Sequence, residues 1–163
     1  MGTLTGTTEV VTDLTYKDTA GNIATATLPV GYSDSESWTA PTRLYQARLT
    51  FVAATPQTIT LDDASLSDVF GDTFNLATLT EIILVNRATT DGYDLEVSGN
   101  FVTAQLLVDW VDDAVKIPVR AGGRLVMTDP NGFTVTDTTA EVITLDPGAN
   151  AFDVDLILHG VNS

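Results

Sequence analysis

The stretch from residue 118 to residue 163 restricts the fold more than any other part of the sequence. In it, short runs rich in Val, Ile, Leu, Phe and Thr alternate with dipeptides that can turn the chain sharply, Gly122-Gly123, Asn131-Gly132 and Pro147-Gly148. β-Branched and aromatic residues suit a pleated, half-buried surface, and Gly, Asn and Pro are the residues that tight turns require. The pattern predicts an antiparallel β-meander.

Strand-like runs also occupy the middle of the chain. Residues 44–51 alternate between apolar and polar side chains, as a strand with one buried face does. Further runs cover residues 57–61, 81–86, 93–97, 104–110 and 114–119. Residues 104–115 could be drawn as a helix, but the run is short and leads into Pro118, which favours an extended chain before it, so we expect a strand or a turn. We expect residues 62–80 to form an excursion with room for a helical turn or a short helix. About eight to ten strands with such turns are typical of an antiparallel β-sandwich or jelly roll.

Residues 1–43 have a different composition from the remainder. Thr and Gly are frequent, apolar residues are scattered, and only residues 23–30 alternate as a strand would. Such a segment buries too little apolar surface to offset the entropy of ordering it, so it is either mobile or laid against another surface. We therefore expect an extended N-terminal arm at residues 1–43 and a β-sandwich domain at residues 44–163.

Composition excludes several classes of protein. The 22 acidic and 7 basic residues give a net charge of −15, which disfavours binding to nucleic acid phosphates and anionic membranes. The chain has no cysteine, so disulfides and thiolate metal sites are excluded. It has no run of about 20 apolar residues that could cross a membrane, and its first residues do not resemble a secretory signal. We expect a soluble protein that is made and used without Sec export.

The residues of common catalytic sites are scarce. His159 is the one histidine, it lies at the end of the last strand-like run, and few serines are near it. No nucleophile elbow, dinucleotide-binding turn or phosphate-binding loop is present. We expect His159 to be a structural or surface residue, and the protein to be neither an enzyme nor a binder of a cofactor.

Clusters of acidic residues leave two alternatives open. Acids gather at residues 91–96 and 109–113, and Asp153 and Asp155 share one face of the last strand. Paired carboxylates can hydrolyse glycosides, and several carboxylates together can bind calcium. Because a chain with 22 acids forms such clusters by chance, we interpret them as solvated turn residues and predict no metal site.

Aromatic residues are the best candidates for binding a partner, because aromatic side chains dominate interface energies. Tyr16, Tyr32 and Trp38 lie in the expected arm, and Trp110 lies in the expected domain. We predict that these four residues contact a partner. The alternative for Tyr32 and Trp38 is packing on the sheet of their own chain.

Five segments together resemble a known family. Residues 117–127, 133–137, 140–145 and 152–160 resemble the C-terminal half of small tailed-phage virion proteins of the jelly-roll cement, or decoration, type. Residues 93–99 are similar to the mid-domain strand of those proteins. The resemblance spans about 70 residues, consists of strands and turns, and does not include the arm.

The resemblance implies an all-β protein, an antiparallel β-sandwich of jelly-roll type, with no enzymatic activity. It implies a protein made in the host cytoplasm that sits on the exterior of the virion capsid. Its partners would be the major capsid protein, whose neighbouring subunits it clamps, and itself, as a dimer or trimer. One alternative is a carbohydrate- or receptor-binding β-sandwich of a virion tail or cell surface that uses Trp110 and nearby acids. Another is a tail-tube or connector component.

Overall fold

The computed structural model describes residues 7–9, 14–16, 26–28, 35–37, 42–63, 66–68, 71–107 and 116–162. It divides the chain into two compact units, Met1–Ala40 and Pro41–Ser163. In the first unit, β1 (Thr7–Glu9) pairs antiparallel with β4 (Ser35–Ser37). In the same unit, β2 (Leu14–Tyr16) pairs antiparallel with β3 (Ala26–Leu28). The alternating run expected at residues 23–30 therefore contains a strand.

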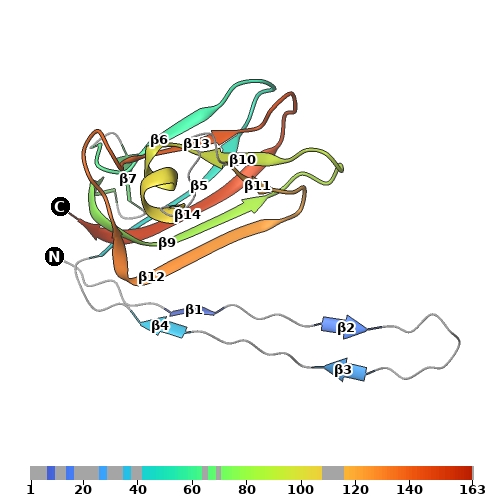
Figure 1. The fold of residues 1–163 in the computed structure, drawn as a ribbon, viewed down its shortest axis with the longest axis horizontal. Coiled ribbons are helices and arrows are strands. Elements are labelled where there is room, and N and C mark those ends of the chain that lie inside the picture. The colour runs from blue at the N-terminus through green and yellow to red at the C-terminus, as the bar shows by residue number, and fades with distance from the viewer. Residues whose placement is uncertain are drawn as a thin grey trace, which may run out of the picture. The chain divides into compact units, whose positions relative to one another are not determined.

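The second unit holds two four-stranded sheets, drawn as two layers in Figure 1, and all neighbouring strands in them are antiparallel. One sheet has the order β11-β10-β13-β6. The other has the order β12-β9-β14-β5. The strands of the first are β6 (Gln57–Thr60), β10 (Leu95–Ser98), β11 (Ile117–Val119) and β13 (Val142–Asp146). Those of the second are β5 (Thr42–Thr50), β9 (Leu76–Asn86), β12 (Arg124–Thr134) and β14 (Asp153–Asn162).

The core lies between the inner faces of these two sheets. In β14, every second residue is fully buried, namely Val154, Leu156 and Leu158. From the other sheet, Leu95 and Leu145 enter the same buried cluster. Side chains of a strand alternate between the two faces of its sheet, so the alternation in the sequence becomes one buried face and one outer face. The prediction of an antiparallel, sandwich-like all-β fold is confirmed.

The prediction that the chain reverses at Asn131-Gly132 is wrong, although a local turn is present, in which Asp129 Oδ1 accepts a hydrogen bond from the Asn131 N–H (2.9 Å). Instead, β12 continues through this segment and pairs with β9 on both sides of it, Thr128 with Glu81 and Phe133 with Leu79. The extra residues form a bulge, in which Gly132 has a φ of +81°. A glycine takes such a backbone without strain, and a bulge inserts residues without reversing the strand. Two predicted strands are therefore one.

Of the two alternatives for residues 104–110, a strand or a turn, the described residues up to Leu107 form a helical turn and no strand. Residues Val102–Leu106 form a single π-helical turn, closed by a hydrogen bond from the Leu107 N–H to the Val102 carbonyl (3.1 Å). Phe101 and Val102 are fully buried there. The side-chain oxygen of Asn100 accepts hydrogen bonds from the N–H groups of Glu141 and Val142. The buried anchors and this link to β13 turn the chain away from a sheet.

Residues 62–80 hold strands where the sequence left room for a helix. Described residues of this segment form the hairpin of β7 (Leu66–Ser67) and β8 (Thr73–Phe74), followed by the start of β9. Phe74 is fully buried, and its ring lies 5.6 Å from that of Tyr45. Burial of Phe74 against β5 favours the extended hairpin over a helical turn.

Candidate functional site

The four aromatic residues predicted to bind a partner are not gathered into a described site. Tyr16 is the last residue of β2, and its side chain lies outside what the structure describes. Tyr32, Trp38 and Trp110 lie outside the described residues, as do the acids at 109–113. Their role as partner contacts stays a prediction.

His159 is a structural residue, as predicted. Its side chain is fully buried in β14, and its Nδ1 lies 2.7 Å from Oγ1 of Thr80. The Thr80 hydroxyl donates its one proton to the His159 carbonyl (3.0 Å), so Nδ1 is the donor of the ring contact. Burial lowers the pKa of His159 from 6.5 to about 4. A buried, neutral histidine in the middle of a sheet is in no position to act on a substrate.

The acids at residues 91–96 do not form a cluster. Asp94 pairs with Arg120 (3.2 Å), and Glu96 pairs with Lys116. Asp91 accepts a hydrogen bond from the N–H of Gly92 (3.1 Å). These carboxylates have separate partners, which agrees with their interpretation as turn and surface residues.

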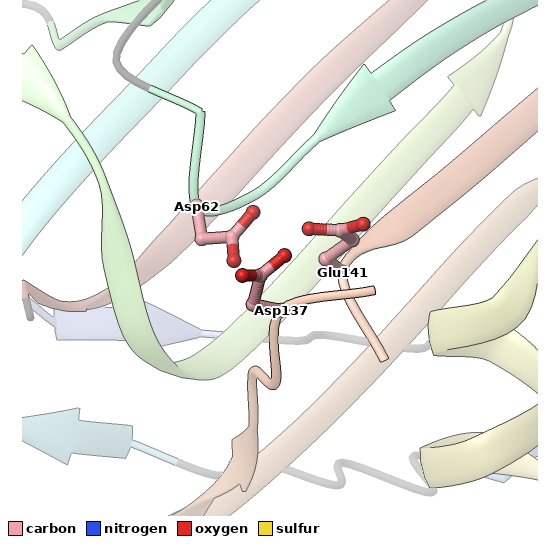
Figure 2. A group of neighbouring side chains, drawn as sticks. All are labelled: Asp62, Asp137 and Glu141. Carbon is pink, nitrogen blue, oxygen red and sulfur yellow. The ribbon is translucent and has the colours of Figure 1, made fainter. Parts of the chain in front are cut away.

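Three other carboxylates do meet, those of Asp62, Asp137 and Glu141 (Figure 2). One oxygen of each lies within 4.8 Å of the others. Asp62 follows β6 and Glu141 precedes β13, and these two strands pair through Val142 and Thr60. The pairing brings the two acids together, whereas nothing in the local sequence marks them as neighbours.

The three carboxylates repel one another. The Asp62 carboxyl, which shares a hydrogen bond with Glu141, raises the pKa of Glu141 above its ordinary value, and partial burial adds to the effect. A divalent cation would relieve this repulsion, and calcium takes six to eight oxygen ligands. Three carboxylates supply six oxygens only if each binds through both of its oxygens. Otherwise backbone carbonyls or waters would have to complete the shell of ligands.

A network of charged residues lies on the outer face of β14. Asp155 accepts hydrogen bonds from Arg48 (Nε to Oδ1, 2.7 Å) and from Arg87. These two guanidinium groups lower the pKa of Asp155, the bond from Arg48 being the larger cause. Both arginines are more than half exposed. The network lines an open groove of about 700 Å³ that also includes Val85 and Ile157.

A second open groove, of about 440 Å³, lies beside this network. Its lining includes Arg87, Asp153 and the partly exposed Tyr93 and Phe152, and Phe51 lies beneath them with its side chain buried in the core. The Phe152 centroid is 6.0 Å from that of Phe51 and 6.4 Å from that of Tyr93. Aromatic rings next to a guanidinium and a carboxylate are groups that can bind a sugar ring. The groove could not be predicted from the sequence because its lining residues come from three segments that are far apart in the chain, residues 50–51, 87–93 and 151–153.

Comparison of the chain with protein-family models and with curated protein sequences gave no match. In the part of the chain that the structure describes, no helix has the length and apolar character needed to cross a membrane.

Proposed function

We propose that the protein is a non-enzymatic virion structural protein that decorates and stabilises a phage capsid shell. In this proposal residues 44–163 form a jelly roll that sits on the capsid exterior and clamps neighbouring major capsid subunits. Residues 1–43 are an extended arm that reaches a second subunit, so that many weak contacts act together. Self-association of the protein is part of the proposal.

The order of the strands in the two four-stranded sheets is the main observation that supports the proposal. Numbered 1 to 8 along the chain, the strands of the two large sheets have the orders 1-8-3-6 and 2-7-4-5. Strands 1 and 8, 2 and 7, 3 and 6, and 4 and 5 are therefore neighbours. A long antiparallel ribbon that wraps around a core places its strands in this way, so the strand order supports the proposed jelly roll. Viral capsid domains are one class of protein that uses it.

Two further observations favour a structural role. The single histidine is buried and bonded to Thr80 within the sheet, so it lines neither groove. The carboxylates of Asp94, Glu96 and Asp155 are each bound by a basic side chain, so they are engaged in ion pairs on the protein surface.

Co-sedimentation with heads of the cognate phage, stripped of accessory proteins, tests the proposal. We expect saturable binding at a fixed ratio to the major capsid subunit. A variant that lacks residues 2–35 should remain folded, as measured by circular dichroism, and bind the heads more weakly. Lack of binding by the full chain at micromolar concentration would overturn the decoration role. Full affinity in the shortened variant would overturn only the role of the arm.

A carbohydrate-binding function is the second candidate, and the groove beside Tyr93 and Phe152 favours it. Sugars stack their apolar faces on aromatic rings, and in this groove Asp153 and Arg87, which also pairs with Asp155, are the charged groups that could bond sugar hydroxyls. A glycan array measured with and without calcium separates the two functions. A decoration protein should bind no glycan on it, whereas binding that is lost in Tyr93→Ala would favour the second function.

A further inference from the structure

One half of the outer face of the sheet β12-β9-β14-β5 combines apolar and arginine side chains. Strand register places two successive outward rows there. The apolar row contains Val126, Ile83 and Ile157, in neighbouring strands. The charged row contains Arg124, Val85, Asp155 and Arg48, and Arg87 follows at the end of β9. We call these eight residues the arginine face.

Positive charge exceeds negative charge on the arginine face, in contrast to the remainder of the described chain. Elsewhere each basic residue pairs with at least one acid of its own: Arg43 with Asp68 and Asp72, Lys116 with Glu96 and Asp146, and Arg120 with Asp94. On the arginine face, Arg48 and Arg87 share the single acid Asp155. Arg124 is exposed and forms no ion pair with a described residue. Even with nearby Asp153 included, three positive charges face two negative ones.

The apolar row next to these arginines is partly accessible, and the exposed polar residue Gln46 of β5 continues it beyond Ile157. Val126 is 38% exposed and is one of two large apolar side chains that are exposed among the described residues; the other is Val52, at 66%. The opposite sheet presents different outward residues, such as Thr144, Glu96 and Asp146. Apolar side chains combined with arginine are typical of the buried centre of protein interfaces, where other charged residues are depleted. Among the described residues, the two outer faces therefore differ in chemistry, and apolar side chains lie beside arginines on the arginine face.

We propose that the arginine face docks an acidic surface of a second copy of this chain. The chain has 22 acidic and 7 basic residues, and its net charge is −15. A second copy therefore offers an excess of carboxylates, which are the groups that the three arginines can bind. Such a contact joins two different patches. It is heterologous, and it produces a closed ring or an extending chain of copies. The inference rests on the self-association in the proposed function and names the surface responsible.

Sedimentation velocity of the full chain, from low to high micromolar concentration, tests the inference. Measurement at about 0.15 M salt, where the Debye length is about 8 Å, screens the overall repulsion between acidic molecules and leaves direct contacts in place. We expect the average mass to rise with concentration. The association constant should fall by at least about tenfold in Arg124→Glu and in Val126→Glu, as for residues at the centre of an interface.

Matched controls lie on other surfaces of the same domain. Val52→Glu and Arg120→Glu make the same chemical changes at side chains that are exposed but lie outside the arginine face. Both should associate as the unchanged protein does, and circular dichroism should report the same fold in all four variants. A protein that stays monomeric throughout would overturn the inference, as would equal association of Arg124→Glu and Arg120→Glu. Shell binding is measured separately by co-sedimentation, so failure of the decoration role and failure of this inference are distinguishable. A protein that stays monomeric would remove self-association from the proposed function as well.

Discussion

Burial of His159 should make the stability of the protein depend on pH in a defined range. The pKa of His159 is lowered from 6.5 to about 4 because burial disfavours the charged ring. Between these two values the unfolded chain binds a proton that the folded chain does not. Stability from this residue is therefore complete above pH 6.5 and is lost as the pH falls through 6.5 toward 4.

The size of the effect follows from the shift in pKa. One pKa unit corresponds to 1.36 kcal/mol, so a shift from 6.5 to about 4 corresponds to a loss of about 3 kcal/mol in the free energy of unfolding. This is a large part of the about 5 to 15 kcal/mol by which a domain is stable. Many carboxylates titrate in the same range, so a variant is needed to isolate the histidine.

His159→Gln provides that comparison, because glutamine fills a similar volume, offers an amide group to Thr80 and does not titrate. Urea unfolding of both proteins between pH 7.5 and pH 4 gives the difference in unfolding free energy at each pH. We expect this difference to change by about 3 kcal/mol as the pH falls, in favour of the variant. The single histidine also allows its pKa to be read directly by NMR.

A difference that is constant with pH would refute the reasoning. An NMR pKa near 6 would also refute it. That value would mean that a favourable charge offsets burial, and the nearest candidate is Glu81, a buried acid that is the register partner of His159 in β9.

Three other changes have outcomes that the structure determines. Glu141→Gln should raise the melting temperature at pH 7 and have a smaller effect near pH 4, because the raised pKa of Glu141 makes its ionised form unfavourable in the folded state and this penalty vanishes as the pH falls. Gly160→Ala should destabilise by about 1 to 3 kcal/mol or more in urea unfolding, since the added Cβ would contact the Thr78 carbonyl oxygen and lie 2.9 Å from Leu76 Cδ1. Gly148→Ala, its control, meets no atom within 4 Å and should lose only about 1 kcal/mol, from its φ of +59°. Leu156→Ala should lose about 2 to 5 kcal/mol in the same assay, because the side chain is fully buried in the core.

Much of the described fold could be predicted from short-range patterns in the sequence. The alternation at residues 44–51 corresponds to β5, and the last apolar run corresponds to β14 with its inward Val154, Leu156 and Leu158. Such patterns are informative because the side-chain period of a strand is two residues and turn residues act locally. The structural role of His159 could also be predicted from the residues around it.

The functional surfaces could not be predicted in the same way. The contacts between Asp62 and Glu141, and between Asp155 and Arg48, depend on the register of strands that are far apart in the sequence. A period of two residues identifies a strand but not its partner strand, and a shift of register by one residue would move each side chain to the opposite face.

The sequence by itself determined that the second unit is built of antiparallel strands, where most of them lie, and which face of β5 is buried, because the alternation and the turn residues that indicate them are local. Only the tertiary structure decided that β12 continues through its bulge, that Val102–Leu106 coils, and that three arginines share one face. Each of these follows from pairing with a distant strand or from burial of a distant side chain, and both are set by the packing of the whole core.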